Sequence, residues 1–334
     1  MHTILADNVR DALPKAVKYL IQKGQIEKTR IGDAWVSPTP VTIKYYRPKE
    51  HVLINRYRDA NPFFHLMEAM WMLAGRNDGA FLDHYVKDFS KLYGNKNGII
   101  PDAYGFRWRY RLGYDQLGLI IDMLKKDTTT RQAVLQMWDD DLTVVEGPKP
   151  CNLVAAFRIR EDKLDMTVFN RSNDLIWGCC GANAVHFAIL QEYIASMLSI
   201  QQGIYYQVST NLHFYKEHHD MLTKRIDHID KRTSFSYLWT AGSYEETNPL
   251  ITFPNVFDEE LQEVMQMIDY ITQDKEIYDG NISNKFLRDV VLPMAIAHRM
   301  YKKKDFELAL AAVSRVAAED WRRAGTEWIQ RRIK

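Results

Sequence analysis

Cys151 is the first candidate for chemistry in this sequence of 334 residues. It follows Pro150 in the segment GPKPCNL, directly before a stretch whose composition predicts a strand. A cysteine at a loop-to-strand junction suits a nucleophile, because the thiolate is the reactive form and nearby arginines lower its pKa. An arbitrary cysteine is more often a small buried hydrophobe, so Cys151 alone does not decide between the two roles.

A second cluster lies in the segment FNRSNDLIWGCCGANAVHF, which places Arg171, Ser172, Asp174 and Asn183 around a glycine-bearing turn. Arg171 and Ser172 can donate together to one phosphate, and Asn183 carries the donor and the acceptor needed to bind the edge of a base. Taken alone, Arg171 and Asp174 could equally form an i,i+3 pair on the surface. The cluster predicts a site for a phosphate and a base.

Two other chemistries use the same residue types. Cys151 could form a dyad with His186 or His213, as in a Cys-His hydrolase, but that would leave the Arg-Ser-x-Asp cluster unexplained. A zinc site could be built from four further side chains, but adjacent residues chelate a metal poorly. These four are Cys179, Cys180, His218 and His219. We therefore expect buried thiols at Cys179 and Cys180, and no metal.

The elements that must position these residues are indicated by the apolar pattern. Alternation over residues 35–46 predicts a strand, and the strongly apolar run 63–73 after Pro62 predicts a buried helix. Residues 93–105 have the Gly, Asn and Pro content of a loop that can shape a pocket. Further helices are expected at 9–26, 117–126 and 184–198, and further strands at 132–138, 153–159, 164–169 and 205–208.

The sequence changes character near residue 250. From Asp258 to Lys334 the pattern is almost wholly helical, with Leu261, Val264 and Ile268 on one apolar stripe. We therefore expect a catalytic domain over residues 1–250 and a helical C-terminal extension over residues 251–334.

The composition excludes several classes of protein. The chain has 44 Lys and Arg against 43 Asp and Glu, so no bulk charge draws it to a nucleic acid or an acidic membrane. No apolar run approaches the roughly 20 residues of a membrane helix. Three cysteines and an N-terminus without a secretory pattern fit a reducing compartment, so we expect a cytoplasmic protein.

Six ordered motifs between residues 68 and 215 resemble the thymidylate synthase family, which includes the deoxypyrimidine nucleotide hydroxymethylases of some bacteriophages. The nucleophile after a proline is similar to Cys151, and the Arg-Ser-x-Asp motif, with its later Asn, is similar to Arg171–Asp174 and Asn183. Any one motif would be weak, but six in order argue against chance. The other four are Glu68 with Trp71, Tyr104-Gly105-Phe106-Arg107-Trp108-Arg109, Arg131 with Trp138, and His213-Phe214-Tyr215.

The resemblance implies an α+β fold with a mixed β-sheet flanked by helices, and a homodimer that uses 5,10-methylenetetrahydrofolate as co-substrate. It implies that the Cys151 thiolate adds to C6 of a deoxypyrimidine monophosphate, which makes C5 nucleophilic toward a one-carbon unit. The 5′-phosphate would be bound by Arg171 and Ser172, by Arg131 of the partner subunit, and by Arg30 from a loop.

The resemblance also implies contacts for the base, the sugar and the folate. Asn183 would hold the base, and Asp174 would bind the pterin. His213 and Tyr215 would hold the sugar 3′-hydroxyl. The proton relay and an ordered water would be organised by Glu68 and Tyr104.

Ser90 and Tyr93 stand where synthases of this family usually carry two tryptophans. The first tryptophan packs by the folate and keeps water from an exocyclic methylene intermediate, which a hydride from the folate then converts to a methyl group. A small hydroxyl side chain at Ser90 would admit water, and addition of water gives a 5-hydroxymethyl group and tetrahydrofolate. This departure favours a hydroxymethylase, unless another aromatic such as Trp177 fills the space.

Other positions also depart from the family pattern. Asn152 replaces a His after the nucleophile, and Gln132 replaces the second residue of an Arg-Arg pair. The segment Cys180-Gly181-Ala182 contains one residue more than the pattern, which puts the position of Asn183 in question.

Asn183 is the residue on which base preference depends. Its carboxamide can pair with O4 and N3–H of uracil, whereas hydroxymethylases acting on cytosine generally carry Asp there, so we expect dUMP first and dCMP second. Conventional thymidylate synthesis is the alternative, and a non-catalytic nucleotide-binding homologue is a remote one. The product would be a precursor of modified DNA, as in bacteriophages, so the host cytoplasm is the expected location.

Overall fold

The computed structural model describes residues 1–55, 58–139, 143, 149–219, 222, 249–276 and 280–333. These residues fall into two compact units. Unit 1 takes its members from Met1–Asp59 and Gln116–Tyr244, and unit 2 takes them from Ala60–Asp115 and Glu245–Lys334.

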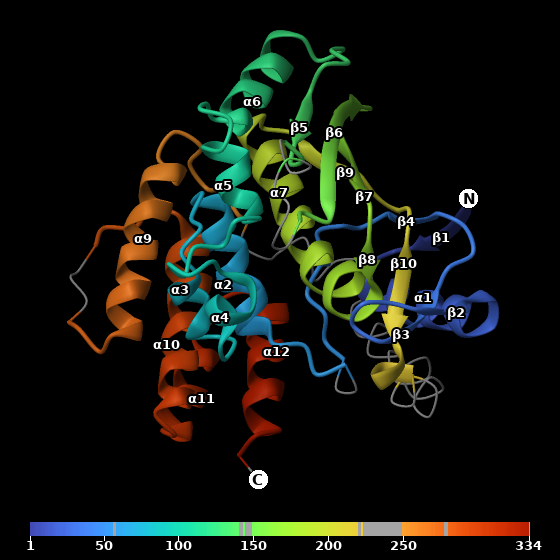
Figure 1. Ribbon diagram of the computed structural model, residues 1–334. Helices are drawn as coiled ribbons and strands as arrows, with labels where there is room; N and C mark the ends of the chain where they lie inside the picture. Colours follow the sequence, from blue (N-terminus) through green and yellow to red (C-terminus); the bar gives the residue numbers. More distant parts are fainter. Residues whose placement is uncertain are drawn as a thin grey trace. The chain divides into compact units, whose positions relative to one another are not determined.

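Unit 1 is built on a six-stranded mixed sheet (Figure 1). The strand His2–Ala6 runs parallel to Val41–Tyr45, and Lys163–Asn170 runs parallel to Gln201–Ser209, whereas the other neighbouring pairs are antiparallel. The strand predictions at 153–159, 164–169 and 205–208 are confirmed, and the one at 132–138 is confirmed as a shorter strand. In spatial order the strands are β1 (His2–Ala6), β4 (Val41–Tyr45), β9 (Gln201–Ser209), β7 (Lys163–Asn170), β6 (Asn152–Arg160) and β5 (Val134–Gln136).

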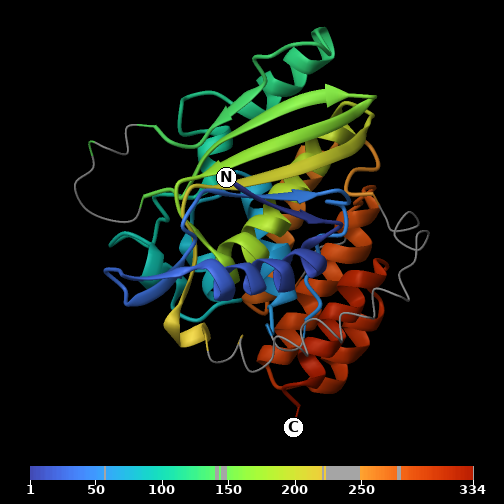
Figure 2. The same ribbon diagram turned by 90° about the vertical axis from the view of Figure 1, so that its right-hand side faces the viewer.

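Helices cover one face of this sheet. Figure 2 shows α1 (Val9–Lys23) and α7 (Asn183–Met197) lying along the same face. In β7, Leu164, Met166 and Val168 are fully buried, whereas Phe169 is 40% exposed. Successive side chains of a strand point to opposite faces, so the face of β7 that carries Phe169 is the more open one. The helix α6 (Gln116–Lys126) packs beside β5 and α7.

A four-stranded sheet completes unit 1, in the order β2 (Gln25–Lys28), β3 (Asp33–Val36), β10 (Leu212–Tyr215) and β8 (Asn173–Asp174). The prediction of one strand over residues 35–46 is wrong, because β3 ends at Val36, β4 begins at Val41, and the two belong to different sheets. The cause is the segment between them, since Pro38 and Pro40 have no N–H to donate to a sheet.

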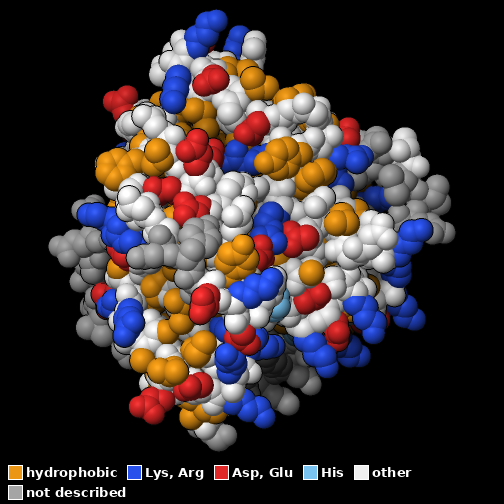
Figure 3. Space-filling model, turned by 90° about the vertical axis from the view of Figure 1, so that its left-hand side faces the viewer, with side chains coloured by type: hydrophobic (Ala, Val, Ile, Leu, Met, Phe, Trp, Pro, Cys, Tyr) orange, Lys and Arg blue, Asp and Glu red, His pale blue; other side chains and the backbone are white. Residues whose placement is uncertain are grey.

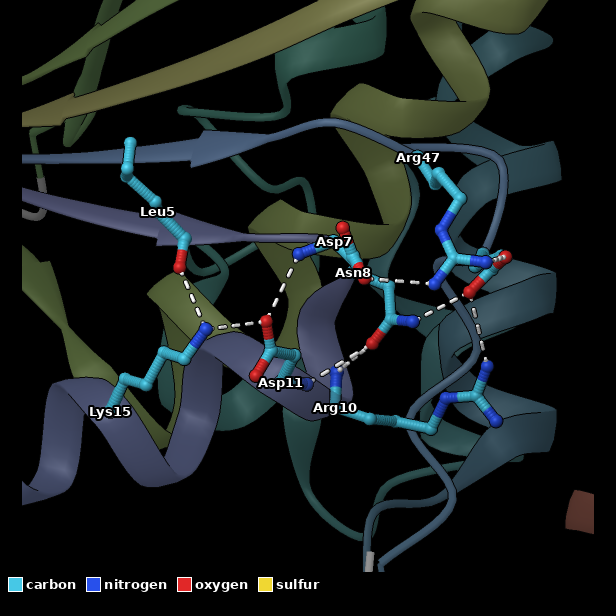
Figure 4. Close-up of polar contacts among 8 residues, drawn as sticks. Leu5, Asp7, Asn8, Arg10, Asp11, Lys15 and Arg47 are labelled. Carbon is cyan, nitrogen blue, oxygen red and sulfur yellow. Dashed lines mark hydrogen bonds and ion pairs between the residues drawn. The ribbon is translucent and has the colours of Figure 1, made fainter. Parts of the chain in front are cut away.

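A buried carboxylate joins the start of α1 to the end of β4 (Figure 4). Asn8 caps α1 by accepting hydrogen bonds from the backbone N–H groups of Arg10 and Asp11. The same side chain donates to Glu50 Oε2 at 2.5 Å, and Arg47 Nη1 lies 2.8 Å from Glu50 Oε1. These contacts fix the loop after β4 on the helix.

Unit 2 is organised around α2 (Pro62–Leu73), whose predicted burial is confirmed, because Phe63, Leu66, Met67 and Met70 are fully enclosed. Pro62 stands in the first turn, where its missing N–H costs nothing. The helices that contact α2 are α3 (Gly79–Asp83), α5 (Tyr104–Arg109), α9 (Phe257–Thr272), α10 (Leu292–Lys302) and α12 (Glu319–Gln330). Unit 2 also contains α4 (Phe89–Tyr93), η3 (Leu287–Val291) and α11 (Phe306–Ser314).

The α+β class and the mixed sheet flanked by helices are confirmed. Three of the helices after residue 250, α9, α10 and α12, pack on α2 within unit 2, while the expected division at residue 250 remains a prediction. Across the described ranges, none of the helices is both long and apolar enough to cross a membrane. Figure 3 shows acidic and basic side chains interspersed over the face that it draws, in keeping with the net charge of +1.

Candidate active site

Cys151 lies immediately before β6 and is half-buried. Its backbone carbonyl accepts a hydrogen bond of 2.9 Å from the backbone N–H of Arg171. The Arg171 guanidinium donates to the carbonyls of Pro150 and Lys149, each at 2.8 Å. Arg171 therefore holds the loop that presents the thiol, in addition to any contact it makes with a ligand.

A cavity of about 320 Å³ in unit 1 brings together four of the predicted nucleotide residues, Arg171, Ser172, His213 and Tyr215. Sequence reasoning missed the other lining residues, because nothing in their local pattern sets them apart from ordinary strand and turn residues. These are Glu27, Thr29, Val36 and Asn211.

The strand β10 positions His213 and Tyr215 two residues apart, so both side chains lie on one face of the small sheet. Their rings meet edge to face, with centroids 5.3 Å apart. Burial raises the pKa of Tyr215, the negative charges of Asp174 and Cys151 add to this rise, and the positive charge of Arg30 opposes it. Arg30 and Cys151 are therefore close enough to Tyr215 to affect its ionisation.

The two remaining arginines of the predicted phosphate site are exposed. Arg30 belongs to the tight turn 29–32, in which Gly32 adopts a φ of 148°. Arg131 lies three residues before β5 at the edge of the large sheet, and neither arginine is among the residues that line the cavity.

Asp174 caps the helical segment η1 (Leu175–Ala182) through Oδ1, which accepts from Ile176 N at 2.8 Å and Trp177 N at 2.6 Å. Its second oxygen, Oδ2, is buried and has no hydrogen-bond partner among the residues that the structure describes. Burial raises the pKa of Asp174, while the Trp177 N–H and the charge of His213 act in the opposite direction. Asp174 Oδ2 can therefore accept a hydrogen bond from an N–H group of a ligand.

The extra residue before Asn183 is accommodated by a wider helical turn. The Asn183 N–H donates to the carbonyl of Gly178, five residues earlier, as in a π-helix. Cys180 and Gly181 leave helical geometry at this point. Asn183 thus begins α7, and its carboxamide accepts from Asn152 Nδ2 at 3.3 Å and donates to Asn173 Oδ1 at 3.1 Å.

Glu68 lies on α2 in unit 2, with its carboxylate oxygen Oε2 buried. Burial raises the pKa of Glu68 to about 8, and the negative charge of Asp102 adds to the rise. A carboxyl group with such a pKa is largely protonated at neutral pH and can donate a proton as well as accept one.

Ser90 lies on the short helix α4, where its N–H and its hydroxyl donate to the two oxygens of Asp83 at 2.8 and 2.5 Å. A Cβ added to Gly79 would stand 2.7 Å from the Ser90 Cβ, so the site is closely packed around a small side chain. Tyr93 is 49% exposed and packs against Phe89, with ring centroids 4.8 Å apart.

Comparison with known proteins identifies the family. Residues 13–276 match the family described as thymidylate synthase. The chain belongs to the thymidylate synthase family. The predicted resemblance is confirmed, and so is the prediction of a one-carbon-transferring enzyme of this family.

Two phage proteins similar to this member of the thymidylate synthase family are both named deoxyuridylate hydroxymethyltransferase. The chain is 42% identical to the deoxyuridylate hydroxymethyltransferase of Pseudomonas phage M6, over 99% of this chain and 95% of the relative. It is 32% identical to the deoxyuridylate hydroxymethyltransferase of Bacillus phage SP01, over 75% of this chain and 71% of the relative. The thymidylate synthase of Buchnera aphidicola subsp. Schizaphis graminum (strain Sg) is 24% identical to this chain, over 65% of this chain and 83% of the relative.

The Tyr-Gly-x-x-Trp-Arg motif of the thymidylate synthase family has a packing role in unit 2. A Cβ on Gly105 would collide with the backbone of Met72, so only glycine lets α5 lie against α2 at this point. Trp108 is buried, and Arg109 Nε donates to the carbonyl of Leu73 at 2.6 Å. The motif thereby fixes Tyr104 at the first position of α5.

Replacing Gly105 by alanine is expected to lower the free energy of unfolding by about 3 kcal/mol, because the new methyl group overpacks the contact between α5 and α2. Denaturant titration measures the loss. Gly98→Ala is the matched control, since Gly98 has a φ of 73° but nothing within 4 Å of its Cβ position. Its expected cost is about 1 kcal/mol, from backbone strain alone. Equal stability of Gly105→Ala and wild type would contradict the packing role.

Cys179 and Cys180 are both fully buried in η1. Burial raises the pKa of Cys179, and its Sγ contacts Gln207 Oε1 at 3.3 Å. In the part of the chain that the structure describes, no group of three or more His, Cys, Asp or Glu side chains is arranged to hold a metal ion.

Proposed function

We propose that the protein transfers a one-carbon unit from 5,10-methylenetetrahydrofolate to C5 of dUMP and releases a 5-hydroxymethyl nucleotide. The observation that carries this proposal is the similarity to the deoxyuridylate hydroxymethyltransferase of Pseudomonas phage M6 over nearly the whole of both chains. dCMP is the second candidate substrate. The compartment that we infer is the cytoplasm of an infected host, where the product is a precursor of modified DNA.

The cavity in unit 1 receives the nucleotide. Arg171 and Ser172 of the cavity lining, together with Arg30 from the neighbouring turn, bind the 5′-phosphate, and His213 with Tyr215 binds the sugar 3′-hydroxyl. Asn183 binds the base. The Cys151 thiolate adds to C6.

The folate supplies the one-carbon unit when it is bound. The buried, unpartnered Oδ2 of Asp174 fits an N–H of the pterin ring. Glu68, with its raised pKa, and Tyr104 hold and move the protons that the reaction at C5 requires. Ser90 and Tyr93 would lie on the folate side, where a serine in place of a tryptophan would leave water a path to the intermediate.

The enzyme acts as a homodimer through the open face of the six-stranded sheet. The strand registers place one row of side chains across this face, in the order Leu5, Lys44, Tyr206, Thr167, Ala156 and Val134. Leu5 and Val134, on the two edge strands, are 52% and 46% exposed, and Phe169 on β7 between them is 40% exposed. Exposed apolar side chains spread over one face of a sheet are typical of an interface. A neighbouring hollow of about 510 Å³ is lined by Gln136, Trp138, Leu153, Val154 and Arg171.

In this homodimer, Arg131 at the sheet edge binds the phosphate in the site of the other subunit. Mixing and refolding two inactive variants, Cys151→Ser and Arg131→Ala, tests this placement. Only the mixed dimer then contains one site with both residues, so a 1:1 mixture should recover about a quarter of the wild-type turnover. Absence of recovery, with mixed dimers demonstrated by native mass spectrometry, would contradict the shared site.

The activity itself is tested by incubating the purified protein with methylenetetrahydrofolate and either dUMP or dCMP. Mass spectrometry identifies the nucleotide product, and absorbance reports any dihydrofolate. We expect 5-hydroxymethyl-dUMP without dihydrofolate. Thymidylate with stoichiometric dihydrofolate would instead show a conventional thymidylate synthase, and no turnover of either nucleotide would show a non-catalytic homologue.

A further inference from the structure

Three asparagine side chains form a continuous chain of hydrogen bonds at the start of α7. Asn152 Nδ2 donates to Asn183 Oδ1 at 3.3 Å, and Asn183 Nδ2 donates to Asn173 Oδ1 at 3.1 Å. Asn173 Nδ2 in turn donates to Ser209 Oγ at 3.0 Å. We call these four residues the amide chain. Its members come from β6, β8, β9 and α7, all within unit 1.

The amide chain is enclosed except at Asn183. Asn152, Asn173 and Ser209 are 1%, 2% and 1% exposed, whereas Asn183 is half-buried. The backbone of Gly178 packs against the centre of the chain. A Cβ at Gly178 would stand 2.8 Å from Asn173 Oδ1 and 3.3 Å from Asn183 Nδ2, so the absence of a side chain there leaves room for the pair.

Because the amide chain is buried, the donor-to-acceptor direction of its hydrogen bonds restricts how the Asn183 side chain can be oriented. If Asn183 alone rotated by half a turn, its NH₂ would face the NH₂ of Asn152, and its oxygen would face the oxygen of Asn173. Both hydrogen bonds would be lost in a place that water reaches poorly, which is costly. Reversal of Asn183 therefore requires reversal of Asn152 and Asn173 as well.

We propose that Asn152 and Asn173 are positioning residues that set the base preference of the enzyme by holding the carboxamide of Asn183 in one orientation. This inference rests on the proposed function, in which Asn183 binds the base. Within the described part of the site, Asn183 keeps one N–H and one oxygen lone pair for a ligand. The amide chain fixes on which side each of them lies.

Uracil and cytosine present opposite patterns to such a carboxamide. Uracil offers an acceptor at O4 and a donor at N3–H, whereas cytosine offers a donor at its amino group and an acceptor at N3. For a base held in one pose, a carboxamide of fixed orientation pairs with only one of these edges. The locked amide therefore favours dUMP over dCMP, and release of the lock should weaken that preference.

The test compares the affinities for dUMP and dCMP by titration calorimetry, together with kcat/KM for both nucleotides. Asn173→Leu removes the acceptor from Asn183, and Asn152→Leu removes the donor. Each is expected to lower the dUMP to dCMP ratio about fivefold to tenfold, corresponding to one buried hydrogen bond. Asn173→Asp keeps an acceptor for Asn183 Nδ2 and is expected to retain the wild-type ratio.

Gln191→Leu is the matched control, because Gln191 is also fully buried but donates to the carbonyls of Leu164 and Ile204, outside the amide chain. It should lose stability and keep the ratio. Gly178→Ala is a second route if a leucine variant does not fold, since it leaves every amide in place and crowds the Asn173–Asn183 pair. It is expected to lower the ratio in the same direction.

The inference is overturned if the leucine variants and Gly178→Ala bind both nucleotides more weakly by the same factor. That result, with wild-type enzyme still hydroxymethylating dUMP, would leave the proposed function intact. A wild-type protein that binds neither nucleotide would overturn both. If the wild-type protein makes thymidylate and the variants have a lower dUMP to dCMP ratio, the proposed hydroxymethylation is wrong. The role of the amide chain in base preference is then supported.

Discussion

Replacing Cys151 by serine is expected to reduce turnover of dUMP by about a thousandfold or more while leaving nucleotide binding largely intact. The hydroxyl of serine ionises far less readily than a thiol, so addition to C6 fails, whereas the phosphate and sugar contacts do not involve the sulfur. Release of tritium from C5-labelled dUMP measures the covalent step directly. Calorimetric titration with dUMP measures the binding that should survive.

Cys179→Ala provides the control for this experiment. Cys179 has a fully buried thiol whose pKa is raised by that burial, and we assign it no part in the reaction. The variant should be less stable because it leaves a small cavity, yet it should still release tritium. Tritium release by Cys151→Ser at the wild-type rate, or its loss in folded Cys179→Ala, would contradict Cys151 as the nucleophile.

Glu68→Gln is expected to lower kcat by about 100-fold to 10,000-fold, because an amide cannot exchange the proton that a carboxyl group exchanges. The pKa of Glu68 is raised to about 8, first by burial and then by the charge of Asp102. Wild-type activity that depends on the protonated acid should therefore fall as the pH rises through about 8. A pH–rate profile measures this limb, which Glu68→Gln should lack.

The same raised pKa makes stability depend on pH. Between the ordinary value of 4.5 and about 8, the folded protein holds a proton on Glu68 that the unfolded chain has lost. The free energy of unfolding should thus decrease as the pH rises through this window, by at most about 1.4 kcal/mol per pH unit from this group. Glu68→Gln should remove that contribution.

Asp102→Asn separates the two causes of the raised pKa. It removes the neighbouring charge and leaves Glu68 buried, so the alkaline limb should move to lower pH without disappearing. An unchanged limb in Asp102→Asn would show that burial alone sets this pKa. A limb retained in Glu68→Gln would assign the titration to another group.

The parts of the site that the sequence predicted are those whose chemistry depends on local motifs. Arg171 and Ser172 are adjacent, and His213 and Tyr215 share one strand face, so their convergence on one cavity follows from short segments. The amide chain was not predicted, because Asn152 and Asn173 meet Asn183 only through pairing and packing of distant strands and a helix. The departure at Asn152 was visible in the sequence, but its partner was not.

In the fold, too, some elements could be predicted from the sequence and others could not. Long periodic segments such as 63–73 and 184–198 predicted α2 and α7 nearly to the residue. The short helices α3, α4 and α5 were not predicted, since five or six residues carry little periodicity and depend on tertiary contacts such as Gly105 against Met72. The strand β1 was also missed, because its pairing partner β4 lies 39 residues away in the register.

Because Cys179 and Cys180 are buried, the folded enzyme has a single accessible cysteine thiol, that of Cys151. Cys179 and Cys180 have no exposed surface, whereas Cys151 is half-buried at the site. A thiol reagent should therefore label the native protein once per chain and the denatured protein three times. The number of labels per chain would report the fraction of folded active sites in a preparation. Bound dUMP would protect the Cys151 thiol from the reagent.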